Sequence, residues 1–446
     1  MRFSRDAFRY CSHYRLSIFL VLCIFCGGTA KTVYLFKLPL FVISLFFIGW
    51  ILTQTDRRSL KSLFEPGLLI LAALPLLYVV YLIPLPSWLW SGLASKTLVV
   101  DGYQVLDQAL PVAPLSLTPE ATLLSIFSFL PVIAIVLITR LTPNKGEIDA
   151  AVGTLWSVTV VVGLLGILQI LMGETLLRFY ETVYLTRPVG PFSNINHFAS
   201  LMVVALPFCI LMASSQHHKS DMITRRRTKT FGLMTVTLLV AAIVLAGSSA
   251  GYLLLLLCLS LSVMSFQKST GSRRLAVLFW LIGLIFLLVD YFIFSGEFLT
   301  LLNKLSRSAP TSRSEIFQTT WAAIQQGGAF GYGPGSFSEV YKVFEQRDTI
   351  SINFVNEAHN EYLQLWFEFG YLGLLWIIVL VFWMLRKAEV VFRRKGYSSH
   401  IQKASLISLL MLALHSVADY PLRTIAIAAV ASFLLTVVVN HDEPIL

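Results

Sequence analysis

The chain has 446 residues, of which 56% are hydrophobic and 13% are charged, and its mean hydropathy is +0.75. A soluble chain of this length would form about two or three domains, and this composition excludes that class. The formal net charge of +10 favours basic loops that lie against anionic lipid over a nucleic-acid partner.

Long apolar runs follow one another along the chain, and their continuity favours helices over strands. A helix needs about 20 apolar residues to cross a bilayer, where only helices and closed barrels satisfy their backbone hydrogen bonds. We therefore predict an all-α polytopic membrane protein, a single integral membrane domain over residues 1–446, with about twelve transmembrane helices. The predicted spans are centred near Cys23, Ser44, Ala73, Leu130, Val161, Val204, Leu239, Leu257, Gly283, Leu374, Leu410 and Phe433.

The basic residues are distributed unevenly between the two ends of these spans. If the first span crosses outward and anchors the chain, about two thirds of the 34 Lys and Arg residues fall on one side. Basic loops stay in the cytoplasm, so this bias predicts that both termini are cytoplasmic. The five cysteines lie in or beside apolar runs, which favours buried thiols over a redox pair at Cys23 and Cys26.

Three outward segments are long enough to carry a site, at residues 84–119, 173–195 and 295–358. The third is long for a connector and is expected to be partly helical, with a helix over 314–326. The Gly-rich stretch GYGPGSF at 331–337 predicts tight turns, and a plain turn is favoured over a phosphate-binding loop. Aromatic residues of the outward loops, such as Trp88, are expected to form an interfacial belt more readily than to stack on sugars.

The segment EAHNEYLQLWFEFGYLG at 357–373 places a polar, His-centred group directly before an apolar helix. It has His359 followed by Asn360, then nine residues, then Gly370 and Gly373. This spacing resembles the signature of the O-antigen ligase and Wzy-type polymerase superfamily, including its exopolysaccharide members.

The resemblance extends over residues 120–435. GPFSNINHFAS at 190–200 is similar to the family's Gly-x-x-x-Asn-x-Asn segment and contributes Asn194 and Asn196. The stretch from Arg313 to the Gly-rich turn resembles its Arg and Trp element, and HSVADYPLR at 415–423 resembles its late His, Asp and Pro segment.

The resemblance implies a metal-independent glycosyltransferase of the GT-C type that needs no cofactor. Its donor would be a glycan on undecaprenyl pyrophosphate, and its acceptor would be lipid A-core or another lipid-linked glycan. The reaction would take place on the periplasmic face of the bacterial inner membrane, where 295–358 would be a large periplasmic loop. Polymerisation and ligation of the glycan both remain open.

Such a transfer needs a base near the acceptor hydroxyl and cations near the departing pyrophosphate. An unperturbed imidazole titrates near pH ~6.5, so His359 is the predicted base, with a helix-capping histidine as the alternative. Asn360 is expected to hold the imidazole or a sugar hydroxyl, or to cap the helix. Asn194 and Asn196 are further candidates for the surroundings of the acceptor.

Arginine binds phosphate oxygens through a planar fork that stays charged near lipid. The candidates for the donor pyrophosphate are Arg313, Arg187 and Arg423, although Arg423 is also placed for a local ion pair with Asp419. The family commonly carries an arginine where GSSAGY at 247–252 has Ala250. We expect Arg187 or Arg423 to substitute for it, and the gap favours a polymerase modestly over a strict ligase.

Three carboxylates, Glu357, Glu361 and Glu368, flank the His-centred motif. Glu368 falls deep enough along the helix to suggest either the acceptor groove or an ion pair with another helix. Asp419 is predicted to be an interfacial residue, and His415 is predicted to hydrogen-bond across helices.

A flippase for lipid-linked sugars, or another polysaccharide transporter, is the alternative to an enzyme. Transporters of this kind carry paired repeats with charges near the midplane of both halves. Here the polar motifs gather in and beside the outward loops, which favours the enzyme.

Overall fold

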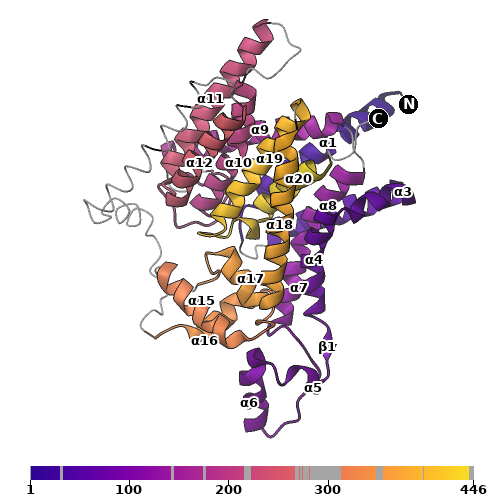
Figure 1. Ribbon diagram of the computed structural model, residues 1–446, viewed down its shortest axis with the longest axis vertical. Helices are drawn as coiled ribbons and strands as arrows, with labels where there is room; N and C mark the ends of the chain where they lie inside the picture. Colours follow the sequence, from indigo (N-terminus) through magenta and orange to yellow (C-terminus); the bar gives the residue numbers. More distant parts are fainter. Residues whose placement is uncertain are drawn as a thin grey trace, which may run out of the picture.

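The computed structural model describes residues 2–30, 34–141, 145–173, 177–214, 222–266, 313–347, 355–394 and 396–440, together with residues 271, 274 and 281. The regular secondary structure of these parts is almost entirely helical (Figure 1). The α-helices are α1 (Arg2–Cys26), α2 (Tyr34–Gln54), α3 (Arg57–Leu60), α4 (Pro66–Val80), α5 (Ser87–Trp90), α6 (Thr97–Val105), α7 (Pro119–Phe127), α8 (Phe129–Leu141), α9 (Lys145–Leu171), α10 (Ile195–Ala213), α11 (Met222–Ala246), α12 (Ser249–Phe266), α15 (Arg313–Gly327), α16 (Phe337–Phe344), α17 (Glu361–Phe369), α18 (Tyr371–Arg393), α19 (Tyr397–His415) and α20 (Ile425–Asn440).

Short 3-10 helices and one small strand pair complete the described elements. The 3-10 helices are η1 (Lys61–Phe64), η2 (Ala94–Lys96) and η3 (Pro421–Arg423). Strands β1 (Pro84–Leu85) and β2 (Ala113–Pro114) pair antiparallel, with Leu85 opposite Ala113. They close the lobe that carries α5 and α6, which extends away from the helical bundle (Figure 1).

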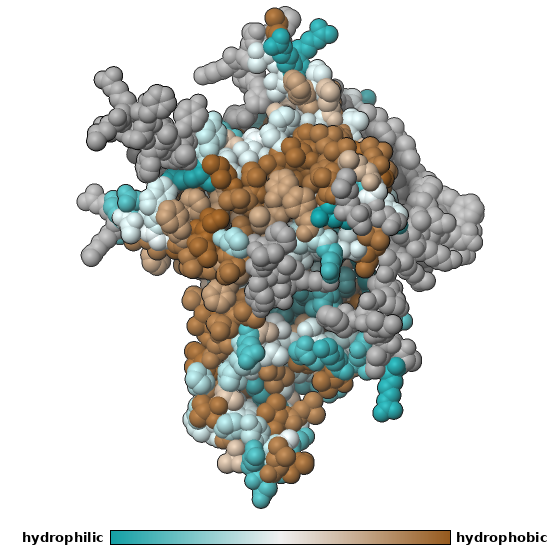
Figure 2. All heavy atoms as spheres, turned by 180° about the vertical axis from the view of Figure 1, so that it is seen from behind, coloured by the Kyte–Doolittle hydropathy of each residue, from teal (hydrophilic) through white to brown (hydrophobic). Residues whose placement is uncertain are grey.

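Six helical segments of the described chain are long and apolar enough to cross a membrane. They are Lys37–Gln54, Pro119–Leu141, Gly146–Leu171, Ile195–Ala213, Arg226–Ala246 and Ser249–Phe266. Shorter apolar helices lie at Tyr14–Cys26, Pro66–Val80 and Ile425–Val439. This arrangement supports a multi-pass, all-helical membrane protein, and brown apolar side chains cover much of the bundle surface (Figure 2). The predicted span near Gly283 lies outside the described residues, as do residues 295–312 and 348–354 of the 295–358 loop.

Helix α10 occupies the centre of the bundle. Its span is 94% buried within the protein, whereas no other candidate span exceeds 39%. It packs against α9, α11, α12 and α19, and nearly every residue from Ile195 to Ala213 is buried. The polar residues at its N-terminal end are therefore held in a protein environment.

An outer layer of α15, α16 and α17 packs around its own core, which includes Phe337, Tyr341 and Phe367. The Gly-rich turn at 331–337 joins this layer to the start of α18. There Tyr332 N donates to Phe367 O at 3.1 Å, and Gly333 N donates to Glu368 O at 2.8 Å. The turn thus binds the end of α17, in keeping with a structural turn.

Both glycines of the His-centred motif allow backbones to approach closely. Gly370 has φ of 58°, and a Cβ there would lie 2.1 Å from the carbonyl oxygen of Ala329. That carbonyl accepts a hydrogen bond from Tyr371 N at 2.9 Å. A Cβ on Gly373 would lie 2.5 Å from the carbonyl oxygen of Leu365. Glycine is required at this turn between α17 and α18, because a side chain would push the neighbouring backbone segments apart.

Candidate active site

His359 lies immediately before α17 in a left-handed backbone conformation, with φ of 51°. Such a conformation costs about 1–3 kcal/mol for a residue other than glycine and persists where the surroundings over-determine it. The next residue, Asn360, is the N-cap of α17, and its side-chain oxygen accepts from Leu363 N at 3.0 Å. Asn360 therefore caps the helix locally and fixes the chain that presents His359.

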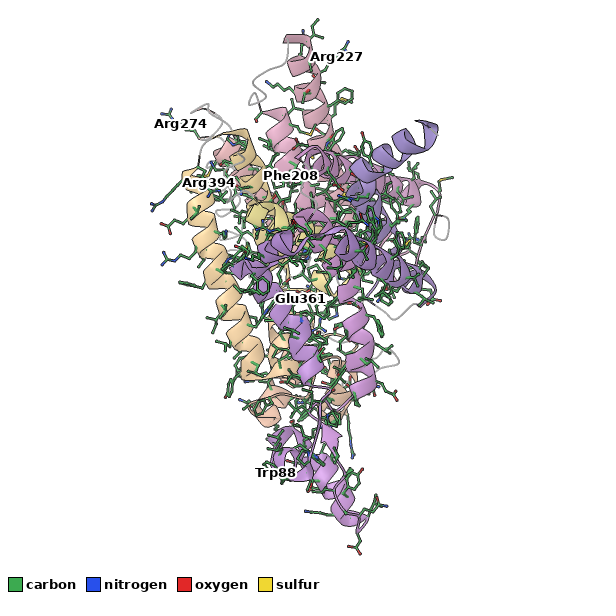
Figure 3. The ribbon with its side chains drawn as sticks, turned by 90° about the vertical axis from the view of Figure 1, so that its right-hand side faces the viewer. Trp88, Phe208, Arg227, Arg274, Glu361 and Arg394 are labelled. Atoms are coloured by element: carbon green, nitrogen blue, oxygen red, sulfur yellow. The ribbon has the colours of Figure 1, made fainter. Side chains whose placement is uncertain are left out.

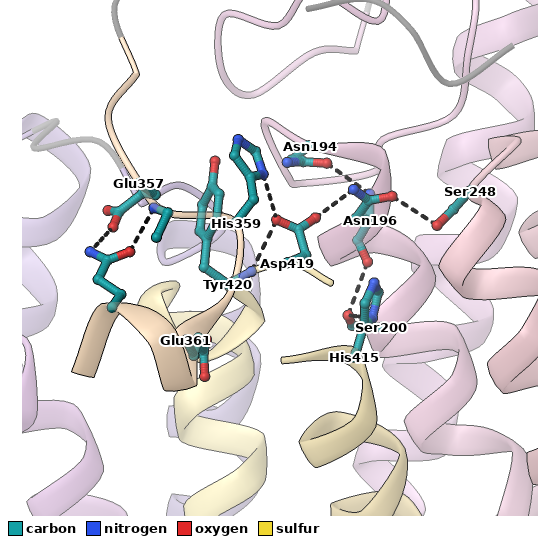
Figure 4. A network of polar contacts seen from close by, with 12 residues as sticks. Asn194, Asn196, Ser200, Ser248, Glu357, His359, Glu361, His415, Asp419 and Tyr420 are labelled. Carbon is teal, nitrogen blue, oxygen red and sulfur yellow. Dashed lines mark hydrogen bonds and ion pairs between the residues drawn. The ribbon is translucent and has the colours of Figure 1, made fainter. Parts of the chain in front are cut away.

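The imidazole of His359 faces a carboxylate from a distant part of the chain (Figure 4). Nδ1 of His359 lies 3.2 Å from Oδ1 of Asp419, in the turn between α19 and α20. The Asp419 side chain is fully buried, whereas the His359 side chain keeps 23% of its surface exposed. The sequence predicted only an interfacial position for Asp419, and the structure adds that the turn buries this carboxylate against the imidazole.

Asp419 is held as a charged carboxylate. Burial alone raises its pKa, but the hydrogen bond and charge of His359, together with His197 and Arg313, hold that pKa well below its ordinary value. A charged carboxylate at Nδ1 fixes the orientation of an imidazole and stabilises its protonated form. The pair therefore has the geometry of a general base with a partner that orients it.

Two further groups bind the same carboxylate. Tyr420 N donates to Oδ1 at 3.0 Å, and Asn196 Nδ2 donates to Oδ2 at 2.5 Å. Asn196 in turn accepts from Ser248 Oγ at 2.8 Å, in the GSSAGY segment. Asn194, the other asparagine of this segment, is the N-cap of α10 and accepts from Asn196 N at 2.8 Å. The two asparagines thus support Asp419, and both are buried.

Two more histidines lie buried behind the site. His415 Nδ1 lies 2.7 Å from Ser200 Oγ, which is the interhelical bond expected from the sequence. His197 packs edge-on against Tyr420, with ring centroids 5.1 Å apart, and neither of its nitrogens has a hydrogen-bond partner within the described structure. His197 was missed by the motif reasoning, although it directly follows the Asn194–Asn196 segment.

Glu368 and Arg423 form an ion pair between α17 and η3, in which the carboxylate is fully buried and the arginine side chain is 20% exposed. The guanidinium donates to both carboxylate oxygens, at 3.1 Å and 2.9 Å, and Gly335 N also donates to the carboxylate at 3.2 Å. Arg423 is thus paired with Glu368, and the expected local pair with Asp419 is wrong. The η3 turn directs Arg423 towards α17, away from its neighbour four residues earlier.

Glu361 ties the start of α17 to the segment that carries Asp419. Its carboxylate accepts from Ser416 Oγ at 2.9 Å and from Leu422 N at 2.6 Å. Burial raises the pKa of Glu361 to about 7. Glu357 accepts from Gln364 Nε2 at 2.5 Å, and burial raises its pKa as well. Glu357, Glu361 and Glu368 therefore each bind a different set of partners around α17.

Arg187 lies against the segment that lacks the family arginine. Its Nη1 donates to Gly247 O at 3.3 Å, three residues before Ala250. Gly247 has φ of 67°, and a Cβ there would lie 2.9 Å from Nη1. The neighbouring Ser248 belongs to the Asp419 network, so Arg187 brings a cation beside the site from the long 173–195 segment.

Arg313 supplies a second cation. It is the first residue of α15 and is exposed, and its charge acts on both Asp419 and His415. Arg187 thus lies beside the network of Ser248, Asn196 and Asp419, and the charge of Arg313 acts on the same carboxylate, whereas Arg423 is occupied by Glu368. Glu361 lies centrally, between Trp88 at one end of the molecule and Arg227 at the other (Figure 3). Within the described ranges, no group of three or more His, Cys, Asp or Glu residues could hold a metal ion.

Comparison with known protein families finds one matching segment. Residues 234–378 match the family model described as O-antigen ligase. The match covers α11 from residue 234 onward, α12, Arg313 and the His359 motif, and it confirms the resemblance to the O-antigen ligase and Wzy-type superfamily. It leaves out Arg187, Asn196 and Asp419, which the structure joins to it. No curated protein matches the chain.

Proposed function

We propose that this protein is a membrane glycosyltransferase that transfers or polymerises a glycan carried on undecaprenyl pyrophosphate. The observation that carries the proposal is the buried Asp419 carboxylate at Nδ1 of the partly exposed His359, a histidine that lies in the segment matching O-antigen ligase. Its acceptor is lipid A-core or another lipid-linked glycan, and the products are O-antigen or exopolysaccharide. The site acts at the periplasmic face of the bacterial inner membrane, with both termini in the cytoplasm.

In the proposed reaction, the acceptor hydroxyl loses its proton to Nε2 of His359 as its oxygen bonds to the anomeric carbon of the donor sugar. The bond from that carbon to the pyrophosphate oxygen breaks, and the electron pair leaves with undecaprenyl pyrophosphate. Asp419 stabilises the imidazolium that forms, because its negative charge lies 3.2 Å from Nδ1. The proton returns to solvent from the exposed side of His359.

The departing pyrophosphate needs positive charge, and we assign that role to Arg313 and Arg187. Both planar forks are suited to phosphate oxygens and remain charged beside lipid. Arg187 contacts the GSSAGY segment, so it is the better substitute for the arginine replaced by Ala250. Arg423 is assigned to holding α17 in place, because Glu368 already engages its guanidinium on two sides. With two arginines in this role, the proposed reaction needs no metal ion or other cofactor.

The sidedness of the proposal is supported by the placement of basic residues. Arg227, Arg274 and Arg394 lie towards one end of the molecule, opposite the lobe that carries Trp88 (Figure 3). Basic ends of membrane helices are retained in the cytoplasm. The motif residues at the N-terminal ends of α10 and α17 then open to the other side.

Reconstitution tests the proposal. Purified protein in liposomes, given an undecaprenyl-pyrophosphate glycan and a lipid-linked acceptor, is expected to form a new glycosidic bond in the presence of chelator and without nucleotide. Translocation of the donor across the bilayer without any new bond would instead indicate the transporter alternative. In cells, loss of long polymer with single repeats retained would indicate a polymerase, and polymer stranded on undecaprenyl pyrophosphate would indicate a ligase.

A further inference from the structure

One side of α15 is exposed and carries an indole together with amide and hydroxyl side chains. Ser314, Gln318, Trp321 and Gln325 are all exposed and follow one another at spacings of four, three and four. This spacing places them along one stripe of the helix. We call this stripe the α15 face. The opposite side of α15 is buried against α16 and α17 through Ile316, Ala323 and Ile324.

Trp321 is the one large apolar side chain of this stripe and is 44% exposed. Its ring stands edge-on to that of Trp366 on α17, with centroids 5.2 Å apart and planes at 82°. Such a pair holds an indole in a fixed orientation. The other members of the stripe are amides and a hydroxyl, which lipid would leave without hydrogen bonds. The α15 face is therefore suited to a wet, polar ligand rather than to hydrocarbon.

Helix α15 packs against α17, which begins directly after His359 and Asn360. Arg313 stands at the first turn of α15, and its charge helps to lower the pKa of Asp419. A helix rises 1.5 Å per residue, so Trp321 lies about 12 Å and Gln325 about 18 Å farther along the axis. A molecule with its phosphates at Arg313 would extend past the indole if its chain continued along the helix.

We propose that the α15 face is a subsite for the glycan of the lipid-linked donor, with Trp321 as its stacking platform. A sugar ring has an apolar C–H face and polar edges, and a flat indole beside amide groups matches both. Gln318 and Gln325 each offer a donor and an acceptor to hydroxyl groups. The inference rests on the proposed function, because it takes Arg313 as the contact of the donor pyrophosphate.

Binding of a free oligosaccharide tests this subsite independently of turnover. The probe is the repeat oligosaccharide released by mild acid from the surface polysaccharide of the organism that encodes the chain. Its binding to the detergent-solubilised His359→Ala protein is measured by saturation-transfer NMR. Trp321→Ala in this background is expected to weaken binding about tenfold, whereas Trp321→Phe retains most of it. Trp88→Ala is the matched control, because Trp88 is 76% exposed on the separate α5 lobe, and it is expected to change nothing.

Gln325→Ala covers the case in which Trp321→Ala fails to fold, and it is expected to weaken binding severalfold without lowering the unfolding temperature. Equal affinity in Trp321→Ala and Trp88→Ala, or unchanged affinity in Gln325→Ala where Trp321→Ala is unfolded, would overturn the subsite. Absence of oligosaccharide binding to the parent protein would overturn it too. If the oligosaccharide binds through Trp321 but the wild-type protein transfers no glycan, the proposed function fails while the subsite stands.

Steady-state kinetics distinguish a subsite for the donor glycan from a subsite for the acceptor. With a donor that carries a full repeat, Trp321→Ala is expected to raise the donor KM about tenfold with kcat unchanged, since stacking is lost in both ground and transition states. With a donor that carries a single sugar, the same variant should match the wild type. A rise in acceptor KM alone would contradict the assignment to the donor glycan.

Discussion

Nδ1 of His359 lies 3.2 Å from Oδ1 of Asp419, although 60 residues separate the two in the chain. The carboxylate is buried and charged, and the imidazole opens to the surface. Asp419 is therefore a positioning residue for His359 in the proposed reaction. Because its pKa is depressed, the stability it contributes is present above the pKa of an unfolded Asp, about 3.9, and is lost only as the pH falls towards the lower folded value.

Asp419→Asn tests this relationship. The amide keeps the shape but cannot stabilise the imidazolium, so kcat is expected to fall about 100-fold or more with the donor KM little changed. The loss should be present across pH 5–9 because the carboxylate is charged over that whole range. Wild-type activity in Asp419→Asn would remove the carboxylate from the mechanism.

Variants at Arg187 and Ala250 test whether Arg187 takes the role of the donor-binding arginine that the family carries at the position of Ala250. Arg187→Ala is expected to raise the donor KM about tenfold or more through loss of a fork that binds phosphate. Adding Ala250→Arg to this variant should restore part of the donor affinity, since Arg187 contacts the same segment. The exposed Arg386 on α18 provides a control in Arg386→Ala. If Ala250→Arg gives no recovery, the two positions do not serve one subsite.

The Glu368–Arg423 pair is expected to matter for folding before catalysis. Removal of one partner leaves an uncompensated buried charge, so Glu368→Gln should destabilise the protein by about 3–5 kcal/mol in thermal or denaturant unfolding. Replacing both residues together, as Glu368→Met with Arg423→Met, should recover much of that loss. If Arg423→Lys instead raises the donor KM while stability is unchanged, Arg423 contacts the donor.

The raised pKa of Glu361 leads us to expect that the stability of the fold depends on pH. Its folded pKa of about 7 lies above the ordinary value of about 4.5, so the folded state binds the proton more tightly than the unfolded state. Stability should therefore fall as the pH rises from about 4.5 to about 7, and Glu361→Gln should lose this part of the slope. Unfolding temperatures measured over this range provide the check. Glu339→Gln, at an exposed carboxylate, should keep the wild-type slope.

The short motifs predicted His359, Asn360 and Arg313 as members of the site, and these assignments stay predictions. The helical, membrane-spanning character followed from composition. The contact between Asp419 and His359 was not predicted, because proximity to the end of a span is the only local signal that Asp419 carries. Its burial depends on how the turn before α20 folds onto α10 and α17, which no spacing rule contains.

Tertiary packing also decided which charges pair. Arg423 lies four residues after Asp419, and helical spacing would join them, but the intervening 3-10 turn sends the arginine to Glu368. The central position of α10 in the bundle could not be predicted from the sequence either, because its apolar run is similar to those of the neighbouring helices. The sequence named both Arg187 and Arg423 as substitutes for the missing arginine, and only the structure places Arg187 against Gly247 in that segment.

The most direct test of the central claim is glycan transfer by His359→Ala in the reconstituted assay. His400→Ala is the matched control, because His400 lies on α19 beside Phe266 and away from the proposed site. We predict that His359→Ala loses transfer by a factor of about 1,000 or more while it remains folded at the assay temperature, and that His400→Ala is fully active. Transfer by His359→Ala at the wild-type rate would contradict the account.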